Sequence, residues 1–101
     1  MAKGYWVGRV DVTDPEAYKG YVAANAAAFS KYGARFLVRG GAFATREGTS
    51  RPRNVVIEFD SYEKAVACYD SPEYALALEK RKGAALADII IIEGYDGPQP
   101  A

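Results

Sequence analysis

Residues 34–41 read Ala-Arg-Phe-Leu-Val-Arg-Gly-Gly. The apolar run from Phe36 to Val38 is typical of a strand, and the glycine pair after Arg39 is where a strand can bulge or bend. A strand with one solvated face alternates apolar and polar side chains, so an unbroken apolar run indicates that both faces are covered. We expect this strand to continue to about Arg46.

The segments around this strand predict a complete order of elements. Helix starts are marked by Thr13-Asp14-Pro15-Glu16 and by Asp60-Ser61-Tyr62-Glu63, and Ser71-Pro72 is expected to kink or split the second helix. The order predicts an α+β, ferredoxin-like βαββαβ fold, with a four-stranded antiparallel sheet and both helices on one face. The expected strands are residues 5–12, 34–46, 54–59 and 88–94.

Composition narrows the classes of function. Thirteen basic residues balance thirteen acidic ones among 101, so no broad surface for nucleic acid or for an anionic membrane is expected. The chain has no histidine and one cysteine, and no carboxylate cluster has the spacing of metal ligands. We therefore expect neither a metal nor another cofactor. No secretory leader opens the sequence and no apolar run is long enough to cross a bilayer, which favours a cytoplasmic protein.

The length suits one domain, which we place at residues 1–96, with a loose tail at residues 97–101. Three of its strands carry unbroken apolar runs, but two helices can cover only one face of the sheet. A second copy of the chain is the simplest cover for the other face, because a bare apolar strand promotes aggregation. The sequence therefore predicts a homodimer in which two sheets pack together as an α/β barrel.

Several separate motifs occur in a recognisable order. They are Gly4-Tyr5-Trp6, Asp14-Pro15-Glu16-Ala17-Tyr18, Arg35-Phe36-Leu37-Val38-Arg39-Gly40-Gly41, Val55-Val56-Ile57-Glu58-Phe59, Tyr69-Asp70-Ser71-Pro72-Glu73-Tyr74, and Asp88-Ile89 with Glu93-Gly94. On these motifs the chain resembles, over nearly its whole length, the family catalogued as domain of unknown function 1330. The resemblance implies a dimeric α/β barrel of ferredoxin-like protomers paired through their sheets, and it implies no particular reaction. Relatives at the level of the fold include cofactor-free oxygenases of aromatic polyketides and muconolactone-type isomerases.

Polar side chains share the inward faces of the helices with apolar ones. Tyr18 and Asn25 fall on the stripe of the first helix, and Tyr69, Tyr74 and Arg81 on the stripe of the second. One interpretation is a pocket between helices and sheet, with Tyr18, Asn25, Tyr74 and Arg81 contacting a substrate and Tyr69 taking part in catalysis. The other is structural: the hydroxyls reach the edge of the core, Asn25 bonds to the backbone, and Arg81 pairs at a helix end.

Arg39 and Glu58 are the other catalytic candidates. Arg39 ends the second strand, and Glu58 interrupts an apolar run in its hairpin partner. The two side chains either pair structurally with each other or serve a site. In a site, Arg39 would bind a carboxylate or enolate oxygen, and Glu58 or a tyrosine would act as the acid or base.

Two classes of function are compatible with these residues. The first is a cofactor-independent oxygenase or isomerase of a small organic acid or enol, which rests on the polar helix faces and on the analogy of fold. The second is a non-catalytic dimeric module that binds a metabolite or only assembles. A closed pocket with an unpaired carboxylate would favour the enzyme, whereas a space filled by Phe29, Tyr69 and Leu78 would favour the module.

Overall fold

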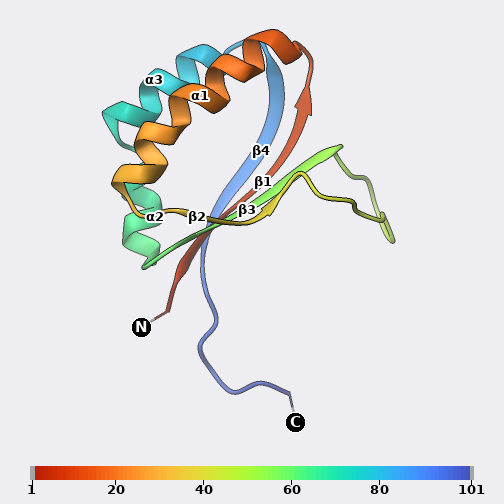
Figure 1. The fold of residues 1–101 in the computed structure, drawn as a ribbon. Helices are drawn as coiled ribbons and strands as arrows, with labels where there is room; N and C mark the ends of the chain where they lie inside the picture. The colour runs from red at the N-terminus through yellow and green to blue at the C-terminus, as the bar shows by residue number, and fades with distance from the viewer. Residues whose placement is uncertain (1, 101) are drawn as a thin grey trace.

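A four-stranded antiparallel sheet carries three helices on one face in the computed structural model, which describes residues 2–100 (Figure 1). The strand order is β2-β3-β1-β4, so β1 pairs with both β3 and β4 at the centre of the sheet. This arrangement confirms the predicted α+β, ferredoxin-like fold. The elements are β1 (Gly4–Val12), α1 (Pro15–Lys31), β2 (Arg35–Arg39), β3 (Arg53–Phe59), α2 (Tyr62–Tyr69), α3 (Pro72–Arg81) and β4 (Ala85–Glu93).

Polar caps start the helices where the sequence predicts them. The side chain of Asp14 accepts a hydrogen bond from the backbone N–H of Ala17 and begins α1. Ser61 and Ser71 cap α2 and α3 in the same way, and Pro72 occupies the first turn of α3. Because a proline within a helix removes a backbone donor, the predicted second helix divides into two at this point.

Two strand boundaries differ from the predicted ones by more than one residue. β2 ends at Arg39 instead of continuing to about Arg46, because Gly40 adopts φ 68° and turns the chain out of the sheet. The backbone N–H of Gly40 then donates to the carbonyl of Asn54, and the exposed segment of residues 41–50 projects beyond the sheet (Figure 1). β4 begins at Ala85 instead of Asp88, since α3 ends at Arg81 and the chain can pair with β1 earlier.

The core lies between the helices and the sheet, and Trp6 is at its centre. Its ring contacts Phe29, Phe59, Tyr69 and Tyr74, with ring centroids 5.0 to 5.6 Å apart. The indole N–H donates to the carbonyl of Ala65 at 2.8 Å, so the only polar atom of this side chain is satisfied inside the core. Trp6 therefore joins α1, α2 and α3 to the central strand.

The opposite side of the sheet carries no helix, and we call it the open face (Figure 1). Strand pairing brings Val7 of β1 beside Val56 and Ile90, and Val38 beside Val56, so apolar side chains from all four strands adjoin on it. Val38 and Ile90 are 43% and 55% exposed. Both faces of the sheet are thus apolar, as the unbroken apolar runs predict.

Within residues 2–100, no helix is both long enough and apolar enough to cross a lipid bilayer.

Gly4 and Gly20 provide a matched test of this packing. A Cβ on Gly4 would overlap the carbonyl oxygen of Ser61 and lie 2.6 Å from Cα of Tyr62, whereas a Cβ on Gly20 would meet no atom within 4 Å. We expect Gly4→Ala to lower the free energy of unfolding by roughly 1–3 kcal/mol through overpacking. Gly20→Ala, in the middle of α1, should raise it by about 0.5–1 kcal/mol. Urea denaturation measures both, and equal stabilities of the two variants would contradict the close approach of α2 to β1.

Candidate functional site

A small cavity lies between the helices α1 and α3 and the sheet. Its volume is about 30 Å³, which is room for one or two water molecules. Aromatic and aliphatic side chains form most of its wall, among them Trp6, Phe29 and Phe36. Its polar lining consists of Tyr18, Tyr21, Asn25, Arg39, Arg53 and Arg81.

Three arginines reach this cavity from different elements. Arg39 ends β2, Arg53 begins β3, and Arg81 ends α3. Each guanidinium lies over an aromatic ring, with Cζ 4.1 Å from the centroid of Phe36 for Arg39, and 5.7 and 4.9 Å from tyrosine centroids for Arg53 and Arg81. The rings orient the guanidinium planes. Within residues 2–100 the Nε–H of Arg53 has no hydrogen-bond partner, whereas Nη1 of Arg81 contacts tyrosine hydroxyls.

The charge of these arginines is not balanced locally. In the part of the chain that the structure describes, none of them is within ion-pair distance of a carboxylate, and no Asp or Glu lines the cavity. Nor do residues 2–100 contain a group of three Cys, Asp or Glu side chains arranged to hold a metal ion. The cavity is therefore electropositive, and the ligand that suits it is an anion.

Two tyrosine hydroxyls contact each other and lie close to the guanidinium of Arg81. The hydroxyl oxygens of Tyr21 and Tyr74 are 2.6 Å apart, and Nη1 of Arg81 lies 3.4 Å from the first and 3.5 Å from the second. Burial raises the pKa of the Tyr21 hydroxyl, and burial raises the pKa of Tyr74 still further. Both hydroxyls are consequently neutral at pH 7, where they can donate or accept hydrogen bonds but are poor bases.

Most of the residues predicted to contact a substrate do gather at this cavity. Tyr18, Asn25 and Arg81 line it together with Arg39. Tyr74 is fully buried and touches Tyr21 instead of lining the cavity itself. Tyr69, a catalytic candidate, packs against the rings of Trp6 and Tyr74 and also lies outside the cavity lining.

Two polar lining residues were missed by the sequence reasoning. Tyr21 follows Tyr18 by three positions on α1, so the helical period places it on the same face, and it could have been named with its neighbours. Arg53, Val55 and Ile57 are spaced two residues apart, which places their side chains on the same face of a strand. Its position before the predicted third strand concealed that signal.

The possible pairing of Arg39 with Glu58 is wrong. Glu58 lies on the open face, where it accepts a hydrogen bond from Nε of Arg35 at 3.0 Å. A bulge between Phe36 and Val38 is the cause, because it adds one residue to β2 and reverses which face the following side chains occupy. Arg35 is opposite Glu58, and Arg39 is opposite Val55 on the helix side.

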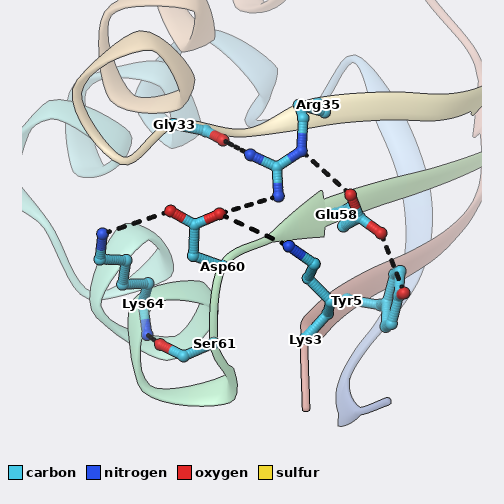
Figure 2. A network of polar contacts seen from close by, with 8 residues as sticks. All are labelled: Lys3, Tyr5, Gly33, Arg35, Glu58, Asp60, Ser61 and Lys64. Carbon is cyan, nitrogen blue, oxygen red and sulfur yellow. Dashed lines mark hydrogen bonds and ion pairs between the residues drawn. The ribbon is translucent and has the colours of Figure 1, made fainter. Parts of the chain in front are cut away.

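Glu58 belongs to a polar network that joins β2 to β3 and α2 (Figure 2). Arg35 is its centre: Nη1 donates to the carbonyl of Gly33, and Nη2 donates to Asp60 at 3.1 Å. The hydroxyl of Tyr5 donates to the second oxygen of Glu58 at 3.0 Å. The Arg35 guanidinium, followed by the Tyr5 hydroxyl, holds the pKa of the Glu58 carboxyl below its usual value. A carboxylate held in this way is a structural acceptor and is remote from the cavity.

The chain matches one family model, and several solved structures have a similar fold. A family model described as "Domain of unknown function (DUF1330)" matches residues 3–95. A protein of unknown function from Rhodopseudomonas palustris has a similar structure, with a TM-score of 0.74 and 17% identity over 95% of this chain and 85% of that one. No curated protein sequence is significantly similar to the chain.

Two further structures share the fold. A cofactor-independent oxygenase from Streptomyces nogalater is similar with a TM-score of 0.61 and 15% identity, over 99% of this chain and 97% of that one. A dimeric protein of unknown function with a ferredoxin-like fold, from Bacteroides fragilis, is similar with a TM-score of 0.60 and 12% identity, over 90% and 95%. At such identities the likeness concerns the fold.

Glu58→Gln tests the network of Figure 2 through its pH dependence. The pKa of Glu58 is lowered in the folded chain, so its ionised form stabilises the fold above the ordinary value of 4.5, and that contribution is lost as the pH falls through the lower folded value. We expect the variant to unfold at a lower temperature than the wild type at pH 7, and the difference to shrink towards pH 3.

Glu47→Gln is the matched control, since Glu47 lies in the exposed segment and forms no ion pair within residues 2–100. It should unfold like the wild type at both pH values. A deficit of Glu58→Gln that is the same at pH 7 and pH 3 would show that the charge of Glu58 contributes nothing.

Proposed function

We propose that this chain, which belongs to the DUF1330 family of domains of unknown function, binds a small organic anion in the cavity between α1, α3 and the sheet. The observation that carries the proposal is the set of three guanidinium groups, from Arg39, Arg53 and Arg81, at one cavity that no Asp or Glu of the described residues lines. A planar guanidinium binds a carboxylate or an enolate oxygen pair through two parallel hydrogen bonds. Tyr18 and Asn25 supply further polar contacts in the same wall.

Entry of a ligand requires the arginines to move. About 30 Å³ holds water but no organic acid. Arg39 is exposed, and Arg53 and Arg81 are half-buried, so their flexible side chains can swing outward and enlarge the cavity at its rim. The ligand then replaces the water that would otherwise solvate the guanidinium groups.

Binding is better supported than proton transfer. No Asp, Glu, Lys or Cys is among the residues lining the cavity, and the raised pKa of Tyr21 keeps its hydroxyl protonated at pH 7. An isomerase must remove and return a proton, and the wall offers no base for this step. Of Phe29, Tyr69 and Leu78, which would have filled the space in the binding module, only Phe29 lines the cavity.

A cofactor-independent oxygenase is the second candidate. Its support is the fold shared with the oxygenase from Streptomyces nogalater. In such a reaction a substrate acidic enough to lose its proton to water would bind as the enolate, the arginines would stabilise its negative charge, and the enolate would then react with molecular oxygen. Consumption of oxygen in the presence of an enolisable acid distinguishes this candidate from simple binding.

A second copy of the chain is the partner that we propose for the open face. The exposed apolar side chains on it, such as Val38 and Ile90, need a cover that the helices do not supply. The similar structure from Bacteroides fragilis is that of a dimeric protein. Two such sheets packed face to face would form the α/β barrel that the sequence predicts.

Arg39→Ala tests the anion site. We expect isothermal titration at low salt to detect binding of pyruvate to the wild type, and native mass spectrometry to detect any small acid that purified protein retains. Loss of one charge-assisted contact should weaken pyruvate binding about tenfold or more in Arg39→Ala. Arg46→Ala, in the exposed segment, removes the same charge and should leave the affinity unchanged. Equal affinities of Arg39→Ala and the wild type would eliminate Arg39 from the site.

Ile90→Asp tests the dimer. A carboxylate at this position would be buried without a partner between two sheets, so the variant should elute as a monomer in size-exclusion chromatography with light scattering. The wild type should have twice the mass of one chain. Leu76→Asp, on α3 at a side chain that is 69% exposed, should remain dimeric. A monomeric wild type at micromolar concentration would overturn the proposed dimer.

A further inference from the structure

Arg53 differs from the arginines that hold the fold together. In Arg35 and Arg51 the Nε–H donates to a carboxylate, to Glu58 at 3.0 Å and to Asp88 at 2.9 Å. The Nε of Arg53 is buried and has no hydrogen-bond partner within residues 2–100. A buried donor without a protein partner is costly and rare, and at the wall of a cavity it is available to an acceptor that a ligand brings.

The glycine after β2 makes the space in which this guanidinium lies. Gly40 has φ 68°, and a Cβ at this position would come within 3.0 Å of Nη1 of Arg53. The N–H of Gly40 also donates to the carbonyl of Asn54 at 2.8 Å, which holds the turn against the start of β3. Gly40 therefore both turns the chain and leaves room for Arg53, a role that its sequence position alone does not indicate.

Arg39 and Arg53 are neighbours on the same face of the sheet. Arg39 pairs with Val55, and Arg53 is two residues from Val55, so the two arginines are diagonal cross-strand neighbours, about 7–8 Å apart in a regular antiparallel pair. That spacing is between residue positions, but both side chains reach the same cavity, so their two positive charges repel each other there. A monoanion can neutralise one of them, whereas a ligand with two anionic groups neutralises both.

We propose that Arg39 and Arg53 form a two-guanidinium clamp that selects a small dianion, of the size of a three- or four-carbon dicarboxylate, over a monocarboxylate. This inference rests on the proposed function, since it names the class of ligand for the same cavity. Each guanidinium binds one carboxylate, and the Nε–H of Arg53 gains the acceptor that it lacks. Arg81 lies on the opposite side of the cavity, at the end of α3, and contacts the tyrosine hydroxyls.

Malonate and propionate are suitable probes, because both have three carbons and they differ by one carboxylate. Isothermal titration at pH 7.5 and low salt should give malonate an affinity at least about tenfold higher than that of propionate, as one additional charge-assisted contact predicts. The ratio of the two affinities is the quantity to follow in variants, because a general loss of folded protein lowers both affinities alike.

Arg53→Met should reduce this ratio to near one. Arg53→Lys keeps the charge but loses the planar fork and the Nε donor, so it should reduce the ratio at least severalfold. Arg46→Met should keep the ratio of the wild type, because Arg46 lies in the exposed segment away from the cavity. Circular dichroism melts verify that each variant is folded.

Gly40→Ala and Gly48→Ala distinguish the effect of displacing Arg53 from the effect of straining the backbone. Both glycines have positive φ, at 68° and 71°, so alanine strains the backbone similarly at each. Only at Gly40 would the new methyl group meet Arg53, since nothing lies within 4 Å at Gly48. Gly40→Ala should lower the ratio, and Gly48→Ala should preserve it.

The outcomes separate this inference from the proposed function. If propionate and malonate bind equally well, or if Arg53→Met keeps the ratio of the wild type, the clamp is refuted while anion binding stands. If pyruvate, propionate and malonate all fail to bind to the folded dimer or monomer, the proposed anion site is refuted and the clamp with it.

Discussion

The bulge in β2 is the constraint on which the candidate site depends. Arg35 and Arg39 are four residues apart, so in a regular strand they would project from the same face. The extra residue between Phe36 and Val38 sends Arg35 to the open face and Arg39 to the cavity. One arginine is thereby committed to the ion pairs with Glu58 and Asp60, and the other has no carboxylate partner among residues 2–100. The bulge therefore places one arginine in structural ion pairs and leaves the other available to a ligand.

Carboxylates are distributed unevenly between the two faces of the sheet. The open face carries Glu58 together with Asp11 and Asp88, and each of them contacts an arginine. The helix side has arginines at the cavity, and within residues 2–100 no Asp or Glu lines it beside them. A chain of zero net charge can therefore contain an electropositive cavity, because pairing on one face leaves the other unbalanced. Net charge indicates little about such a site.

Prediction from sequence succeeded where local chemistry decides the outcome. Caps at Asp14, Ser61 and Ser71 begin the three helices, and helical periodicity brings Tyr18, Asn25 and Arg81 to the cavity. Prediction from sequence failed where pairing with a neighbouring strand determines the position of a residue. The end of β2, the face of Arg39 and the contribution of Arg53 all depend on register, and register is a property of two strands together.

The sequence by itself determined the order of elements, the ferredoxin-like fold and the apolar character of both faces of the sheet, because each follows from patterns within short segments. Only the tertiary structure decided which polar residues meet. Glu58 accepts a hydrogen bond from Arg35, and the hydroxyls of Tyr21 and Tyr74 contact each other. Arg53 lies at the cavity beside Gly40. These contacts join residues or elements that the order of the sequence does not place together, and in β2 a bulge of one residue is enough to change the face on which Arg39 lies.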